Sequence, residues 1–142
     1  MSIKFKNNSK RLQKEFDDLE NLNPSLFGIL QYVKDLCFVD YNKHITVTHI
    51  FRTQSEQEKF YKGRKDKKGK KSPHQFYQAV DIRQLDTTAE IDKVVVKKVN
   101  ERFQWQNDER WYKYVAKHHD IGLGPHIHLQ FLLNPKYDLG RK

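Results

Sequence analysis

Residues 44–50, with the sequence HITVTHI, decide the class of fold that this chain can form. Ile45 and Val47 alternate with polar neighbours, several of them β-branched, and this pattern is typical of a strand with one buried face. Upstream, apolar residues recur at helical spacing from Leu12 to Leu22 and again from Leu26 to Cys37. Helices followed by strands predict an α+β domain.

Two junctions mark the starts of these helices. Ser9 precedes the first helix and is placed to cap it. The pair Asn23-Pro24 predicts a new helix start, with Asn as the N-cap and Pro at the first helical position. Cys37, the only cysteine, fits the buried face of the second helix and excludes a disulfide scaffold or a Cys-rich zinc finger.

Downstream of residues 44–50, the pattern predicts more strands. Residues 78–83 (QAVDIR) form a short strand, and an apolar helix should run to about residue 103. Residues 110–119 and 126–133 are expected to pair as a hairpin around the Gly-containing turn IGLGP. We therefore expect N-terminal helices packed on a small antiparallel sheet.

Length and charge limit the possibilities further. The chain has 142 residues, a mass of 17.1 kDa and a net charge of +9, which suits one domain over residues 1–142 with an anionic partner. Residues 62–71 hold seven basic residues and one acidic residue, which predicts an exposed loop. No apolar run approaches the roughly 20 residues of a membrane span, and the N-terminus lacks the apolar core of a signal peptide. We expect synthesis in a cytoplasm.

Four residues are candidates for a metal-binding site. His126 and His128 lie two apart in PHIHLQF, so on a strand both imidazoles point to one face. Such a pair alone is most often two surface histidines. Asp81 stands inside the apolar strand 78–83 and needs a partner if it is buried, and His74 precedes that strand. Two histidines and a carboxylate leave one ligand position open, as in a catalytic zinc site.

The segments SPHQFYQAVDIR and HIHLQF resemble the zinc D-Ala-D-Ala carboxypeptidases and L-alanyl-D-glutamate endopeptidases of peptidoglycan, which share their fold with the hedgehog signalling domain. The family pattern is Ser-x-His, then Gly, then Ala-x-Asp, and later a His on a closing strand. The upstream segment VTHIFRTQSEQEKFY resembles the family's strand, Arg-Thr and helix. The likeness covers about residues 44–133, and a peptidase-like core over about residues 24–133 is expected.

The resemblance implies roles for single residues. His74, Asp81 and His128 match the three ligands of a Zn²⁺ ion. Arg52 matches the arginine that holds a substrate carboxylate, and Ser72 is the matching substrate-binding serine. The resemblance also implies a peptidase that cuts a bond of the peptidoglycan stem peptide, of the endolysin or virion-lysin type found in bacteriophages. The sequence leaves open which bond is cut.

Two positions depart from the family pattern. Tyr77 replaces the family's Gly, so the loop should bend differently. Pro125 occupies the position where many members have an acidic general base, so the base must come from elsewhere. His126 and Asp120 are the candidates, with Asp120 expected across the hairpin from His126, and His119 is a third. The basic loop at residues 62–71 is expected either to attract anionic wall polymer or to serve solubility alone.

Two other functions remain open on sequence grounds. HIH flanked by apolar residues also fits HUH single-stranded DNA nickases, with Tyr114 as the nucleophile. However, the Tyr-x-x-Lys spacing precedes HIH here, and a nickase gives no role to Ser72, His74 and Asp81. A nucleic-acid partner is therefore disfavoured. The third alternative is an inactive zinc-binding module with a structural or wall-binding role.

Overall fold

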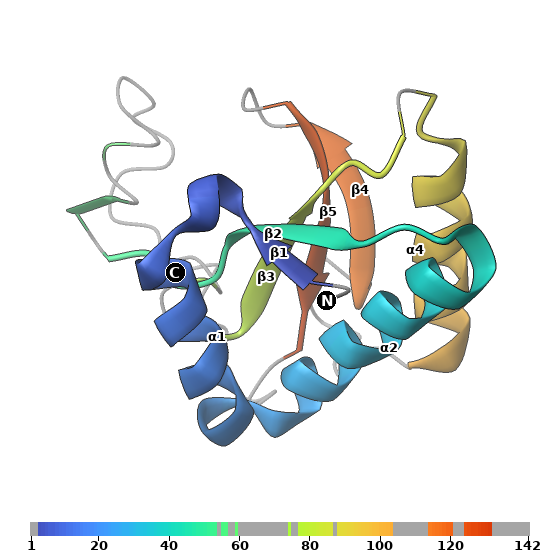
Figure 1. Cartoon of the computed structure of the whole chain (residues 1–142). Helices are drawn as coiled ribbons and strands as arrows, with labels where there is room; N and C mark the ends of the chain where they lie inside the picture. Colours follow the sequence, from blue (N-terminus) through green and yellow to red (C-terminus); the bar gives the residue numbers. More distant parts are fainter. Residues whose placement is uncertain are drawn as a thin grey trace.

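The structure is a computed structural model, and it describes residues 3–53, 55–56, 59, 74, 77–86, 88–103, 114–120 and 124–131. These residues form a mixed sheet and helices that pack against it (Figure 1). The elements in chain order are β1 (Ile3–Phe5), the 3-10 turn η1 (Lys6–Asn8), α1 (Lys10–Leu22), α2 (Pro24–Tyr41), β2 (Ile45–His49), β3 (Ala79–Arg83), α4 (Glu90–Arg102), β4 (Ala116–Asp120) and β5 (Pro125–Gln130).

Both predicted helix caps are confirmed. The Ser9 hydroxyl accepts a hydrogen bond from Leu12 N at 3.2 Å, and the Asn23 carboxamide oxygen accepts from Leu26 N at 3.2 Å. Asn23 does more than cap α2. It is buried, and its amide group donates to the carbonyls of Tyr77 and Phe131, each at 2.9 Å. Asn23 thus ties the junction of α1 and α2 to the chain before β3 and after β5.

The sheet has the strand order β1-β2-β3-β5-β4. The predicted strands β2, β3, β4 and β5 pair antiparallel, and β4 and β5 form the expected hairpin. The expected antiparallel sheet has one further strand at its edge, because β1 pairs with β2 in parallel, with Ile3 opposite Ile45. A three-residue strand is shorter than the window in which alternation can be recognised, and only its pairing with β2 defines it.

A β-bulge interrupts the pairing of β2 with β3. Val47 lies opposite Ile82, and His49 lies opposite Asp81, so β2 advances two residues where β3 advances one. Ile45 and Val47 therefore face the core, while His49 is turned to the other face beside Asp81. Ile50, the next residue, is again fully buried.

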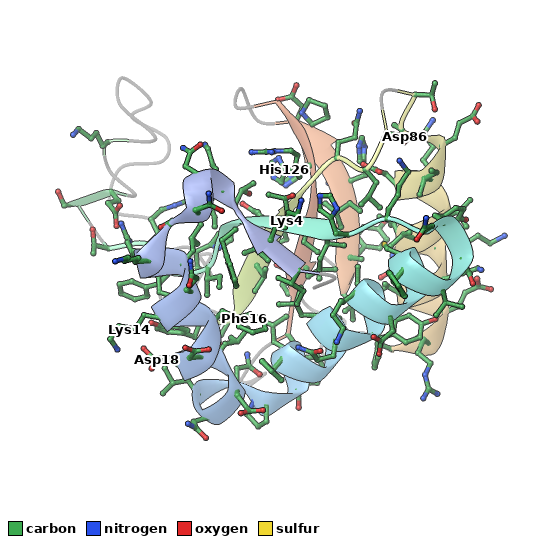
Figure 2. The ribbon with its side chains drawn as sticks, viewed as in Figure 1. Lys4, Lys14, Phe16, Asp18, Asp86 and His126 are labelled. Atoms are coloured by element: carbon green, nitrogen blue, oxygen red, sulfur yellow. The ribbon has the colours of Figure 1, made fainter. Side chains whose placement is uncertain are left out.

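The core lies between the sheet and the helices. The apolar residues of β2, β3 and β5 pack with α1, α2 and α4, and Cys37 is buried among them as predicted. Figure 2 shows Phe16 directed from α1 toward the sheet, where its ring lies 5.5 Å from that of Phe5. The helix-facing side of the sheet is thus filled by apolar groups, which leaves the opposite side for polar ones. Among the described residues, no helix is long and apolar enough to cross a membrane.

Residues 55 and 56 lie in a helical turn, and Thr53 and Glu56 form reciprocal capping bonds at its start. Strand β4 begins at Ala116, later than predicted, and the Asn100 side chain of α4 binds the backbone of Val115 and Ala116 at this start. The basic loop at residues 62–71 and residues 110–113 lie outside the described residues.

Candidate metal centre

Asp81 is the centre of a buried cluster on the polar side of the sheet. It projects from β3, directly opposite His128 of β5. Its Oδ2 atom lies 3.2 Å from Nε2 of His74, and its Oδ1 atom lies 2.9 Å from Nδ1 of His128. One ligand atom from each of the three residues lies within 4.8 Å of the other two, so the group could hold a metal ion. The three residues that the sequence singled out as ligands are therefore brought together.

The orientation of the His74 ring is set by the chain that precedes its strand. Its Nδ1 atom lies 3.1 Å from the carbonyl oxygen of Ile50, which can only accept a hydrogen bond. The hydrogen-bond network thus assigns the proton to Nδ1. In the neutral ring, the Nε2 lone pair then points at Asp81.

The His128 ring has the opposite arrangement. Its Nε2 atom lies 3.0 Å from the side-chain oxygen of Gln130, whose amide group donates to the Tyr114 carbonyl at 3.2 Å. The bond to Tyr114 fixes the orientation of the carboxamide, so Nε2 of His128 donates to it. In the neutral ring, the lone pair on Nδ1 faces Asp81. The sequence analysis did not single out Gln130, although its position two residues after His128 on a strand signals a shared face.

This donor set fits a metal ion. Burial alone would raise the pKa of the Asp81 carboxyl, but His74 and His128, when their rings are protonated and donate to it, hold this pKa well below its ordinary value, so the group is a carboxylate. With both rings neutral, two imidazole lone pairs and a carboxylate converge on one point, and their mutual repulsion requires a cation or added protons. Ligands about 2.0–2.1 Å from a tetrahedral zinc lie about 3.3 Å apart, close to the separations seen around Asp81.

Three more histidines surround the group. His49 Nδ1 lies 3.8 Å from Asp81 Oδ2, and the His119 ring lies 4.5 Å from that of His126 and 5.5 Å from that of His128. Burial, the largest cause, lowers the pKa of both His49 and His119 to about 4, so both rings are neutral near pH 7. His49 reaches the site only through the bulge in β2, and its sequence position gave it no role.

His126 is placed to accept a proton beside the ligands. Its Nδ1–H donates to the Gly124 carbonyl at 3.1 Å, which leaves the lone pair on Nε2. That Nε2 atom is buried, has no hydrogen-bond partner within the described part of the chain, and lies 3.8 Å from Asp81 Oδ1. Figure 2 shows the His126 side chain near the upper end of the sheet. The group of three mutually close ligands does not include it.

Asp120 does not occupy the place that the sequence suggested. The hairpin register puts His119 opposite His126, and Asp120 opposite Pro125 at the end of the ladder. Because neighbouring strand residues alternate between faces, Asp120 falls on the face opposite to His119 and His126. Its Oδ1 atom accepts a hydrogen bond from Gly124 N at 3.1 Å. Of the candidate bases, the register favours His126 and His119 over Asp120.

Arg52 is buried and held next to the cluster. Its backbone N–H donates to the His74 carbonyl at 3.1 Å. Glu15 of α1 accepts from the backbone N–H of Phe51 at 3.2 Å, and Arg11 donates to the Phe51 carbonyl at 3.1 Å. Arg11 also forms ion pairs with Glu15 and Glu56, at 2.7 and 2.8 Å. Helix α1 thus fixes the chain on both sides of Arg52.

A cavity of about 710 Å³ opens beside the cluster. It extends from His49 and Arg52 to the N-terminal segment and α1, where Lys6 and Arg11 line it. A peptide that reached the metal ligands would find space and positive charge here. Ser72, the other predicted substrate-binding residue, lies outside the described residues.

Tyr77 stands where the resembling family has Gly, and its backbone adopts a left-handed conformation with φ of 54°. Glycine adopts this conformation readily, whereas a bulky side chain does so with strain. Tyr77 thus adopts a backbone conformation that glycine forms more readily. The Tyr77 ring stacks on Phe51 with 5.2 Å between centroids, and this contact offsets part of the strain.

Comparisons with protein-family models, with curated proteins and with solved structures found no match to this chain. The assignment of a function therefore rests on the chemistry of the cluster and its surroundings.

Proposed function

We propose that the protein is a zinc-dependent peptidoglycan peptidase that hydrolyses a bond of the stem peptide. The observation that carries the proposal is the convergence of His74 Nε2, Asp81 and His128 Nδ1, with both imidazoles oriented by hydrogen bonds on their far side. Outer hydrogen bonds of this kind hold the ligands of metal enzymes in place. Three protein ligands with one position open are typical of a catalytic rather than a structural zinc site.

Bound zinc would polarise the scissile carbonyl and lower the pKa of a water molecule. The proposed base is His126, whose buried Nε2 lone pair lies beside Asp81 and accepts the proton that the attacking water loses. The same atom then returns the proton to the leaving amine. His119, whose ring contacts that of His126, keeps it in place.

Arg52 is the proposed substrate-binding residue. Arg52 lines the cavity beside the ligands, and the planar fork of N–H donors in a guanidinium group suits a carboxylate. The stem peptide of peptidoglycan supplies such carboxylates, whether the bond cut joins D-Ala to D-Ala or L-Ala to D-Glu. By resemblance, we propose an endolysin or virion lysin that is made in the host cytoplasm and acts at the cell wall. An anionic wall polymer would then be attracted by the basic residues 62–71.

Four variants test this proposal on the purified full-length chain. We expect one zinc per chain and metal-dependent clearing of peptidoglycan, lost with a chelator and restored by zinc. His128→Ala should lose both metal and clearing, whereas the exposed control His44→Ala should retain both. His126→Gln should retain zinc but lose activity by about 10²–10⁴-fold, the usual contribution of a general base. Asp120→Asn should remain close to wild type.

The same experiments also test the other candidate functions. Zinc binding without clearing of any peptidoglycan would contradict the peptidase and leave the inactive zinc-binding module. A covalent adduct between a single-stranded oligonucleotide and Tyr114 would identify a nickase. Unchanged clearing and metal content in His128→Ala would refute the site itself, whereas a chain that clears walls only with iron would refute the choice of zinc.

A further inference from the structure

The cavity beside the metal ligands has an excess of positive charge. Among the described residues that line it, four side chains are cationic and two are carboxylates, an excess of two positive charges. Both carboxylates, Glu15 and Glu56, bind Arg11. Lys6 lines the same cavity and forms no ion pair with any carboxylate in the described part of the chain. A ligand that filled this space would therefore be attracted through its own negative charge.

The N-terminal segment places Lys6 at the rim of this cavity. Strand β1 is held against β2, and the chain then turns through η1, where Asn7 and Asn8 adopt left-handed conformations with φ of 54° and 53°. Asparagine tolerates this conformation better than other residues with a side chain, so the tight turn is stable here. Lys6, between strand and turn, is exposed at the cavity.

Lys6 and Arg52 line the cavity together with His49. His49 itself lies 3.8 Å from Asp81. The two cations therefore lie on the side of the cavity that adjoins the metal ligands.

We infer that Lys6 and Arg52 form a two-cation subsite that selects a peptide carrying two carboxylates beside the bond at the metal centre. Arg52, which is buried, binds one carboxylate with its planar guanidinium group. Lys6, at the rim, attracts the second as a mobile point charge. The inference rests on the proposed function for the position of the bond, but it adds a specificity residue from the N-terminal strand.

The expected effect is modest, because Lys6 is exposed. Ion pairs at exposed positions contribute up to about 1 kcal/mol, which corresponds to about a fivefold change in affinity. Screening by salt should remove most of this difference, since the Debye length falls from about 30 Å at 0.01 M to about 3 Å at 1 M ionic strength.

Binding of two uncleavable ligands tests the inference. The ligands are N-acetylated isosteres of Ala-Glu and Ala-Gln with a reduced amide, which carry two carboxylates and one carboxylate respectively. Their affinities for the zinc-loaded full chain are measured by calorimetry at low salt. Lys6→Met should weaken binding of the Ala-Glu isostere about fivefold and leave the Ala-Gln isostere within twofold. Lys4→Met removes the same charge two residues earlier, outside the cavity lining, and should change neither.

The outcomes separate this inference from the proposed function. Equal affinities of Lys6→Met and Lys4→Met for the Ala-Glu isostere would overturn it, as would an equal loss for both ligands in Lys6→Met. Clearing of peptidoglycan could still be intact in either case. Conversely, selective loss of the Ala-Glu isostere in a protein that cleaves nothing would support the subsite and refute the peptidase. Melting temperature and zinc content, expected to be unchanged in both variants, exclude a folding defect.

Discussion

Replacing Gln130 by Met should weaken metal binding, although Gln130 is not a ligand. Gln130 is buried, and its side-chain oxygen accepts the Nε2–H of His128 at 3.0 Å. Methionine has a similar volume and length but accepts hydrogen bonds poorly. The variant therefore leaves a buried N–H without a good partner on the ring whose other nitrogen faces Asp81.

The magnitude follows from this one bond. A buried donor without a partner costs about 1–3 kcal/mol, and the ring also loses the contact that holds Nδ1 toward the metal. Loss of an outer partner of a metal ligand usually costs 10–100-fold in metal affinity. We expect a decrease of about 30-fold in zinc affinity. The Tyr114 carbonyl also loses its donor, but this loss is common to the metal-free and metal-bound protein and cancels from the affinity.

The assay is a competition titration of metal-free protein against a chromophoric chelator. Gln84→Met is a matched control, because Gln84 makes the same kind of contact, at 2.9 Å, to Nε2 of His118 on the other side of the sheet. The control should retain wild-type affinity, and Gln130→Glu, which keeps an acceptor, should recover most of it. An affinity of Gln130→Met within twofold of wild type, or an equal loss in Gln84→Met, would refute the reasoning.

Three further predictions concern stability and reactivity. Asn23→Ala removes a cap and leaves two carbonyls without their donor, so the free energy of unfolding in urea should fall by about 3 kcal/mol, against less than about 0.5 kcal/mol for the exposed Asn21→Ala. Burial raises the pKa of Cys37 to about 12, so a thiol reagent at pH 8 should modify it only after unfolding, and rapid modification of the native protein would contradict this. Hydrogen bonds from Arg11 lower the pKa of Glu56 from 4.5 to about 2, so its contribution is present above about pH 4.5 and lost toward pH 2. When the pH is lowered from about 4.5 to about 2, the melting temperature of Glu56→Gln should therefore fall less than that of wild type.

Local patterns in the sequence predicted most of the elements that surround the site. The caps at Ser9 and Asn23 and the alternation in β2 and β5 depend on near neighbours in the chain, which a single sequence displays. The ligand group His74, Asp81 and His128 was predicted from spacing and resemblance, and the cluster formed as expected.

Features that depend on contacts between distant segments were not predictable in this way. Strand β1 exists through its pairing with residues 45–47, which lie 42 residues away in the chain. Asp120 was expected opposite His126, but the register of the hairpin, shifted by one residue, places His119 there. An unbroken alternation in HITVTHI predicts no role for His49 at the site. The apolar positions 45, 47 and 50 in fact show a step of three, which indicates a bulge.

The bulge in β2 has a consequence for tolerance to changes in chain length. Because two residues of β2 occupy one step of β3, deletion of Thr48 would restore regular pairing and still leave His49 opposite Asp81 and Ile50 in the core. Deletion of Thr46 would instead reverse the face of the residues before the bulge and expose one of the core positions. The effect of a one-residue deletion on the stability of the fold should thus depend on its position in β2. A deletion at position 48 should be tolerated, whereas one at position 46 should disrupt the core.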